Sequence, residues 1–487
     1  MVTEPMQTET KLQTSRPLRW YDYITINFNW FAITTRGQTL TPLVVPLLVQ
    51  QFVGESVKGA YLGRMRLWSL MAALLIQALM GMLSDRSRLR WGRRRPFIVA
   101  GILLEVIVII LIGISAGLEG MTGYWMLFLL YMASMFASNI SHAATQPLIA
   151  DLVPKDKRGI FSGIKAALEL PVPLIFISLV ISGMISRGNL WGGLISVIAV
   201  LVLSMLVSLW IPERKPDFEP EPFNWQPVLR LLGMTAVFTG VILGGGWIVN
   251  QVLRLTAGQH NGSTPWVVGA AGLTGMSVAI VVGVWASMRV SLGKEEHTNS
   301  SFTFWVINRL AFLVGANNLA GFMVYFLQEK FVEFQGEKAA GPASMIIMFV
   351  GVLILVTAVP SGYLADRIGK RKLLVISGVL AAAGTFVVVL APTLTVVYIG
   401  ACLVGAGVGF FYTSNWALGT EIVPPEQAGR FFGIANLAGA GAGAVGAYIG
   451  GSIADSNSYV LLMAIYGFVF ILSIVMVRWI KVGDSRA

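Results

Sequence analysis

Long apolar segments constrain the fold of this chain more than any other feature of its sequence. Windows of about 19 residues with almost no charge recur along its 487 residues. A bilayer core is about 30 Å thick, so roughly 20 apolar residues are enough for a helix to cross it. The windows predict about 14 transmembrane helices, near residues 24–52, 61–84, 97–117, 124–150, 159–185, 190–211, 231–252, 266–288, 302–328, 342–366, 372–392, 394–418, 430–453 and 458–480.

The composition also indicates an integral membrane protein in a lipid bilayer, because 55% of the residues are hydrophobic and only 12% are charged. A net charge of +11 does not indicate nucleic-acid binding, since the basic residues fall in short clusters between apolar segments. The single Cys402 can form neither a disulfide nor a thiolate metal site within this chain.

Nothing in the sequence indicates an enzyme, a cofactor or a metal site. The chain contains no metal-ligand cluster, no nucleophile elbow and no GxxxxGK phosphate-binding loop, which also argues against primary transport. Residues 439–446 contain a formal GxGxxG pattern, but no strand precedes it and an apolar segment surrounds it. Small residues at four-residue spacing there predict close helix packing instead.

Lys and Arg collect in alternate loops, which predicts that both termini are cytoplasmic. The short termini and loops favour a prokaryotic inner membrane, and no cleavable signal peptide is visible. The oligomeric state stays open, and a monomer is compatible with the sequence. We expect a cytoplasmic segment 1–19, a six-helix bundle 20–212, a linker 213–300 that carries an inserted transmembrane hairpin near 231–288, a second six-helix bundle 301–481 and a cytoplasmic tail 482–487.

An internal repeat relates the two predicted bundles. Three pairs of matching positions occur in the same order, at offsets of 281, 270 and 279 residues, and they argue for duplication of a six-helix unit. In transporters built from repeats, the substrate site lies between the repeated halves. The matching positions are 81–86 with 362–367, 151–163 with 421–433, and Asn29 and Gln38 with Asn308 and Asn317.

The segment 81–97 reads Gly-Met-Leu-Ser-Asp-Arg-Ser-Arg-Leu-Arg-Trp-Gly-Arg-Arg-Arg-Pro-Phe. It resembles the signature loop of the major facilitator superfamily, in the longer form of plant sucrose transporters and related glycoside-cation symporters. Residues 362–372 resemble the shorter form of that loop. The resemblance implies an all-α major facilitator fold with two six-helix bundles, and the hairpin near 231–288 lies outside that twelve-helix pattern.

The same resemblance implies a secondary active transporter that works by alternating access. Its closest branch imports a sugar, glycoside or similar small polar solute, coupled to a proton or sodium. A proton antiporter that exports amphipathic compounds is the alternative, since 14-helix members of the superfamily often do this. Residues 168–174 lack the glycine-proline signature of those antiporters. A membrane receptor or assembly factor without transport activity is a third possibility.

In that family the signature loop acts as a conformational latch. Asp85, at a helix end, can pair with Arg93 or Arg94 in one state and release them in another, with a partner in the other half expected near Glu421 or Arg430. Alternatively, the arginines only set topology. The expected latch residues are Asp85, Arg86, Arg93, Arg94, Asp151, Arg158, Asp366, Arg367, Lys370, Glu421 and Arg430.

Residues 137–152 resemble the fourth helix of the sucrose transporters. Asn139 matches an asparagine of that family. The acid that the family uses for proton coupling aligns with Met135, and the arginine that pairs with it aligns with Gln146. Both charges are absent here, which argues against sucrose as the substrate and against proton coupling through this helix.

Charged residues near the bilayer centre are costly, by at least about 2.5 kcal/mol each, and usually face a cavity or a partner. Arg36 lies roughly 18 Å along its helix from Ile24, near the middle of the membrane. With Gln38 beside it, Arg36 is the first candidate for binding an anionic or polyhydroxylated substrate. The alternative is a structural ion pair with an acid on a neighbouring helix. Glu105 and Glu169 are the candidate acids, either for proton coupling or as that partner.

The remaining candidates carry less specific signals. Lys165 precedes Glu169 by four residues, a spacing that brings the two side chains together on a helix. Amides bind sugar hydroxyls but also join helices, and a lone His142 makes no metal site. The expected pathway residues are Arg36, Gln38, Asn139, His142, Gln146, Asn317 and Asn318, and the expected charge-coupling residues are Glu105, Glu169, Lys165 and Arg309.

Overall fold

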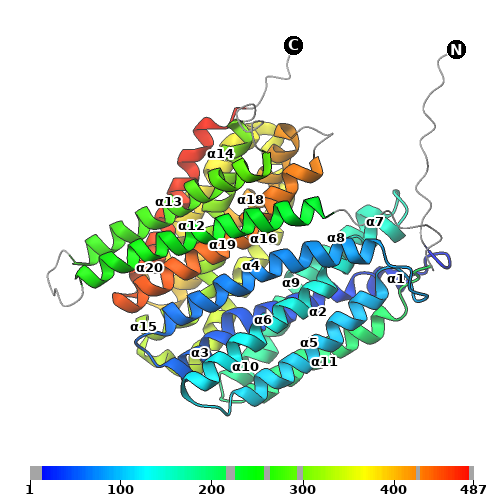
Figure 1. Cartoon of the computed structure of the whole chain (residues 1–487), viewed down its shortest axis with the longest axis horizontal. Helices are drawn as coiled ribbons and strands as arrows, with labels where there is room; N and C mark the ends of the chain where they lie inside the picture. The colour runs from blue at the N-terminus through cyan, green and yellow to red at the C-terminus, as the bar shows by residue number, and fades with distance from the viewer. Residues whose placement is uncertain (1–13, 215–224, 257–263, 293–299, 424–427, 482–487) are drawn as a thin grey trace.

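The computed structural model describes residues 14–214, 225–256, 264–292, 300–423 and 428–481. These residues are overwhelmingly helical, and an isolated bridge between Thr14 and Glu213 is the β-type pairing found among them. Figure 1 shows two helical bundles, one from the first half of the chain in blue and cyan and one from the second half in yellow to red. The expected all-α architecture is therefore confirmed.

The first bundle contains six membrane-length segments. Two of them include π-helical turns close to prolines, which lack the N–H group that a regular helix needs. The elements are α1 (Asp22–Thr25), α2 (Phe28–Thr39), η1 (Leu40–Val44), α3 (Val45–Val53), α4 (Lys58–Asp85), α5 (Arg95–Ser115), α6 (Gly120–Thr145), α7 (Leu148–Leu152), α8 (Arg158–Glu169), α9 (Pro171–Phe176), η2 (Ile177–Ile181), α10 (Ser182–Ile185) and α11 (Leu190–Ser208).

Two long helices then form the inserted hairpin, and the second bundle follows. The hairpin consists of α12 (Gln226–Thr256) and α13 (Thr264–Leu292). The second bundle contains α14 (Ser300–Gly321), α15 (Met323–Lys330), η4 (Val332–Phe334), η5 (Gly336–Ala339), α16 (Ala340–Ile368), α17 (Lys370–Leu390), α18 (Leu394–Ile422), α19 (Ala428–Ser456), α20 (Tyr459–Met476) and η7 (Val477–Trp479).

The number of membrane spans is close to the predicted value of about 14. Among the described residues, 12 helices are long and apolar enough to cross a membrane, and α14 with α15, bent by 58°, makes a thirteenth. The continuous run α2–η1–α3 is about 39 Å long, enough to cross a bilayer core, although it carries more polar residues than the other spans.

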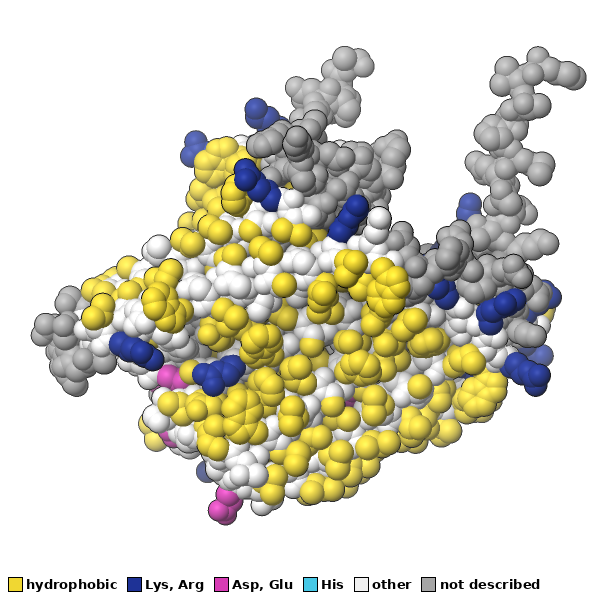
Figure 2. Space-filling model, in the orientation of Figure 1, with side chains coloured by type: hydrophobic (Ala, Val, Ile, Leu, Met, Phe, Trp, Pro, Cys, Tyr) yellow, Lys and Arg dark blue, Asp and Glu magenta, His cyan; other side chains and the backbone are white. Residues whose placement is uncertain are grey.

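The hairpin lies against the second bundle and also reaches the first. Helices α12 and α13, green in Figure 1, contact α19, and α12 additionally contacts α4 of the first bundle. In Figure 2 hydrophobic side chains cover the face between the helix ends, whereas most Lys and Arg side chains lie toward the ends. This distribution is the one expected for a protein surrounded by lipid.

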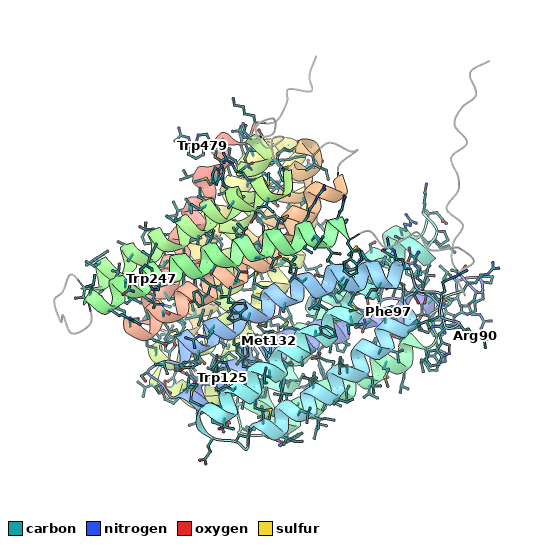
Figure 3. The ribbon with its side chains drawn as sticks, viewed as in Figure 1. Arg90, Phe97, Trp125, Met132, Trp247 and Trp479 are labelled. Carbon is teal, nitrogen blue, oxygen red and sulfur yellow. The ribbon has the colours of Figure 1, made fainter. Side chains whose placement is uncertain are left out.

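The helices of both bundles begin and end at the same two sides of the molecule, which we call the Arg93 end and the Asp455 end after residues described below. The Arg93 end carries the loop between α4 and α5 and, in the second bundle, Lys370 and Arg478. The Asp455 end carries the start of α4 and the end of α19. Figure 3 shows Arg90 at the Arg93 end of the first bundle and Trp125 toward the opposite end.

Helices α4 and α19 join the two bundles through close backbone contact near the Asp455 end. A Cβ atom on Gly59 would lie 2.7 Å from the carbonyl oxygen of Gly451. A Cβ atom on Gly63 would clash with the carbonyl oxygen of Ala447. Residues 439–446 lie within α19, where Gly446 touches the Asn318 amide. The glycine-rich sequence therefore serves helix packing, as predicted.

Candidate substrate and coupling site

A buried ion pair connects three helices of the first bundle. The Nε atom of Arg36 on α2 lies 2.6 Å from Oε1 of Glu105 on α5. The hydroxyl of Ser134 on α6 donates to the same carboxylate oxygen at 2.6 Å and accepts from Nη2 of Arg36. Arg36 and Glu105 are only 3% and 1% exposed. Of the two candidate acids, Glu105 is thus the partner of Arg36.

The ion pair lies beside the position where the resemblance places a coupling acid. Met135 occupies that position, and its Sδ atom is 3.9 Å from Nη1 of Arg36. A cavity of about 10 Å³, near the lower limit for one water molecule, is lined by Arg36, Glu105, Asn29 and Ser138. The second carboxylate oxygen, Oε2 of Glu105, makes no hydrogen bond to a described residue. Glu105 therefore has one oxygen available for a proton.

An asparagine on the first helix of each bundle organises a polar network. Asn29 donates from Nδ2 to Ser141 at 2.8 Å and to Thr145 at 2.6 Å, and its Oδ1 accepts from Ser204 at 3.0 Å. These bonds connect α2 to α6 and α11 inside the first bundle.

The equivalent network in the second bundle is built around Asn308. Its Nδ2 donates to the carbonyl oxygen of Ser473 at 2.8 Å, and its Oδ1 accepts from Asn415 at 3.4 Å. Asn415 and Ser473 follow Thr145 and Ser204 by 270 and 269 residues, matching the offset of the sequence repeat. The duplication is thus visible in side-chain contacts that could have been found by extending the repeat to α11 and α20.

A second charged cluster lies on α8 and α6. Nζ of Lys165 is 3.2 Å from Glu169 and 4.0 Å from the ring centroid of Trp30. The ring of His142 meets Trp30 edge-on at 5.3 Å, and Gln146 lies 3.5 Å from His142. The side chains of Lys165 and Glu169 are 31% and 37% exposed. Glu169 is therefore paired on its own helix and separate from the Arg36 pair.

The amide candidates have different surroundings. Asn318 is buried and donates to the carbonyl oxygens of Val314 and Ala442, so it joins α14 to α19. Asn317 is exposed, with Nδ2 3.5 Å from the Gly439 carbonyl.

The other candidates, on α2, α6 and α14, do not take part in the contact between Asn318 and α19. Asn139 donates to the Met135 carbonyl of its own helix at 2.8 Å, and Gln38 is half-buried. Arg309 on α14 donates to Oδ1 of Asn415 at 2.7 Å.

The latch residues form ion pairs that stay within each bundle. Arg93 lies 2.7 Å and Arg94 3.1 Å from Asp151, and both also pair with Asp85. In the second bundle Lys370 pairs with Glu421. The pairs made by Asp151 and by Lys370 each lie within one bundle, and the side chain of Arg430 lies outside the described residues.

The other expected latch residues do not join these pairs. Arg158 donates to the carbonyl oxygens of Ala150 and Val153, and Arg86 donates to that of Met82. Asp366 and Arg367 are exposed, and the Arg367 guanidinium lies 4.4 Å from the ring centroid of Tyr363.

Glu213, which follows α11, anchors the signature loop. It accepts from the backbone N–H groups of Arg94 at 2.6 Å and Arg95 at 2.9 Å. Burial raises the pKa of Glu213, although these hydrogen bonds oppose the shift. The sequence places this residue in a polar linker, and no local pattern identifies it as an anchor.

The two bundles are joined by polar contacts at the Asp455 end, which the sequence did not predict. The carboxylate of Asp455 on α19 accepts from the backbone N–H groups of Gly59 at 2.8 Å and Ala60 at 2.7 Å, at the N-terminus of α4. The positive end of the α4 dipole favours an anion there. The hydroxyl of Tyr459 donates to the same carboxylate at 3.0 Å.

Further contacts close this end between α3–α4 and α15. Nζ of Lys58 lies 2.9 Å from Gln328 and 4.5 Å from the ring centroid of Tyr325. The Tyr325 hydroxyl donates to the carbonyl oxygen of Pro46 at 2.6 Å. Since such contacts join residues that are hundreds of positions apart, only the folded structure shows them.

Known proteins resemble this chain in sequence and in fold. A model of the Major Facilitator Superfamily matches residues 30–329 and 306–487. Sucrose transport protein SUC4 of Arabidopsis thaliana is 32% identical over 105 residues, which cover 18% of this chain and 19% of that protein. The uncharacterized MFS-type transporter Rv1877 of Mycobacterium tuberculosis is 30% identical over 104 residues, covering 21% of this chain and 15% of the relative. These alignments cover less than a fifth of each relative.

Solved structures match over nearly the whole length. The D-xylose-proton symporter has a TM-score of 0.63 at 15% identity, covering 96% of this chain and 100% of that chain. The peptide transporter POT in complex with sulfate has a TM-score of 0.64 at 15% identity, covering 98% and 97%. Proteins with this fold and family model are transporters rather than enzymes. The chain is therefore an integral membrane transporter that belongs to the Major Facilitator Superfamily.

Proposed function

We propose that this transporter imports a small polar solute, of the sugar or glycoside type, together with a proton. The buried pair of Arg36 and Glu105 carries this proposal. Removing one partner of such a pair leaves an uncompensated buried charge, so protonation of Glu105 destabilises the arrangement around Arg36. Proton binding and the conformation of α2, α5 and α6 are thereby coupled.

Alternating access is supported by where the two bundles touch. Their polar contacts lie at the Asp455 end, whereas the ion pairs at the Arg93 end stay within one bundle. The basic loops favour a cytoplasmic location for the Arg93 end and for both termini. On this orientation the structure is an inward-facing state, in a membrane that we take to be a prokaryotic plasma membrane.

Sugar-like substrates are supported by the cluster on α2, α6 and α8. The Trp30 ring is buried beneath Lys165, and the partly exposed Lys165 and Glu169 beside it offer a hydrogen-bond donor and an acceptor. Binding sites commonly combine an aromatic surface with a few polar groups in this way. The similarity to sucrose transport proteins points in the same direction.

Export of amphipathic compounds is the second candidate function. It rests on the hairpin α12–α13, which raises the helix count above twelve and is common among drug antiporters. Helix α12 contacts both α4 and α19, so the hairpin lies where the two bundles meet.

Uptake into proteoliposomes tests the proposal. Labelled monosaccharides and disaccharides are added with an inward gradient of protons, of sodium or of neither, to the native chain, Glu105→Gln and the control Glu119→Gln. Glu119 is exposed at the start of α6. We expect proton-stimulated uptake in the native chain and the control, and loss of the stimulation in Glu105→Gln. Stimulation by sodium alone would contradict the proposal that the coupling ion is a proton. No uptake of any sugar would favour the exporter or a receptor without transport activity.

A further inference from the structure

The charges inside the membrane do not balance. Four basic side chains lie two or more turns inside membrane-length helical segments and are buried or half-buried: Arg36, Arg66, Lys165 and Arg309. Arg36 is paired with Glu105, and Lys165 with Glu169. Among the described residues, no carboxylate pairs with Arg66 or Arg309. Since uncompensated buried cations are costly, they usually mark a site for an ion or substrate.

Arg309 lies between aromatic side chains of α18 and is 6% exposed. Its Nη1 atom donates to Asn415, but its Nε atom makes no hydrogen bond to a described residue. The guanidinium is 4.8 Å from the ring centroid of Trp416. The phenol of Tyr412, which interacts electrostatically with both Arg309 and Glu169, is 38% exposed. Arg309 thus lies in the second bundle beside a surface that faces the Lys165 cluster of the first.

Arg66 on α4 lies where α14 ends and α15 begins. It is 4% exposed, and its Nε and Nη1 atoms make no hydrogen bond to described residues. Its Nη2 atom is 3.5 Å from the Asn317 carbonyl, a weak contact with the negative end of α14. The ionisable groups that act on it are the phenols of Tyr131 and Tyr466. The guanidinium also lies 5.8 Å from the ring centroid of Phe322, and among the described residues these contacts include no carboxylate.

Both arginines lie along α14: Arg309 belongs to this helix, and Arg66 of α4 contacts it near its C-terminal end. Asn317, which Arg66 contacts, is eight residues from Arg309, about 12 Å along α14. A neutral sugar would leave both guanidinium groups uncompensated, whereas a carboxylate or phosphate would neutralise one and form paired hydrogen bonds with it. The side-chain amides of Asn317 and Asn415 are neutral, so they cannot neutralise a guanidinium group.

We propose that the transported solute carries one negatively charged group, a carboxylate or phosphate, which Arg309 binds, with Arg66 as a second cation along the path. This inference rests on the proposed transport function and narrows its substrate class from sugar-like solutes in general to acidic ones. A monoanion that crosses with one proton carries no net charge, so its transport is electroneutral. Neutral sugar with a proton would instead move positive charge.

Matched acid and neutral probes test the inference on the full chain in proteoliposomes. The pairs are methyl β-D-glucuronide with methyl β-D-glucoside and D-glucuronate with D-glucose, and glucose 6-phosphate tests the phosphate form. We expect kcat/KM to be at least tenfold higher for the acid of each pair, or for glucose 6-phosphate over D-glucose. Transport of the monoanionic glucuronates should be accompanied by no proton-driven current. Arg309→Gln should abolish this preference, and Arg309→Lys should retain part of it.

The control is Arg64→Gln, two residues from Arg66 on the same helix but exposed. It should leave the acid-to-neutral ratio unchanged, whereas Arg66→Gln should lower it. A purely structural role of either arginine would change thermal stability without changing that ratio. Preference for the neutral member in the native chain, or an unchanged ratio in both Arg309→Gln and Arg66→Gln, would overturn the inference while leaving the transport function intact. Transport of no probe would overturn both.

Discussion

Arg36 and Glu105 form an ion pair with a 2.6 Å separation between Nε and Oε1, almost completely shielded from solvent. The resemblance to sucrose transporters places a coupling acid at the position of Met135 on the fourth helix, where this chain has no charge. The acid has moved to α5, but it approaches an arginine within contact of the same position. Under the proposed function, Glu105 on α5 would take the coupling role that the resemblance places on the fourth helix.

Breaking this pair should destabilise the protein more than removing it entirely. We expect Arg36→Met alone to cost about 3–5 kcal/mol, because Glu105 is left buried without a partner. The double variant Arg36→Met with Glu105→Leu should recover a large part of that loss. Unfolding in detergent, compared across the two single variants and the double variant, measures the coupling. Additive single effects would show that the two side chains do not stabilise each other.

The sequence predicts the depth of charged residues better than their partners. Arg36, Glu105 and Glu169 all lie well inside apolar segments, and their depth identified them as candidates. Depth alone could not decide between Glu105 and Glu169, since the choice depends on how α5 and α8 are rotated and packed against α2. The i, i+4 spacing of Lys165 and Glu169 was the local signal that favoured the observed arrangement.

The contacts between the two bundles could not be predicted from the sequence. The internal repeat identified equivalent positions in the two halves, and the Asn29 and Asn308 networks follow it. Asp455 has no counterpart in that repeat pattern and binds backbone N–H groups almost 400 residues earlier in the chain. No periodic pattern in the sequence predicts such a contact, because it depends on how the two bundles pack against each other.

The two latch ion pairs should differ in strength although they are equivalent by duplication. Lys370 and Glu421 are 25% and 41% exposed, so solvent screens their interaction and removing it should change stability by less than about 1 kcal/mol. Asp151 bridges Arg93 and the buried Arg94, so Asp151→Asn should cost about 2 kcal/mol or more. Unfolding of Asp151→Asn and Glu421→Gln, side by side in detergent, tests the difference. Equal losses would contradict it.

Glu213 should make stability depend on pH. Its pKa is raised in the folded protein from an ordinary value of 4.5, so the folded state holds this proton more tightly than the unfolded state. The contribution is fully present below about pH 4.5 and is lost as the pH rises through the folded pKa. We expect the advantage in Tm of the native chain over Glu213→Gln to shrink from pH 4 toward pH 7. A difference that is constant with pH would exclude titration of Glu213 as its cause.

Asp455 should hold the two bundles together at its end of the molecule. Asp455→Asn weakens two charge-assisted hydrogen bonds to the N-terminus of α4, each worth about 1.5–3 kcal/mol, so the state open at this end should gain population by at least tenfold. Spin labels at the exposed Glu119 and Val332, in a Cys402→Ser background, report the distance between bundles. Longer distances should appear in Asp455→Asn but not in the exposed control Glu333→Gln. An unchanged distribution in Asp455→Asn would mean that the glycine contacts between α4 and α19 close this end without the carboxylate.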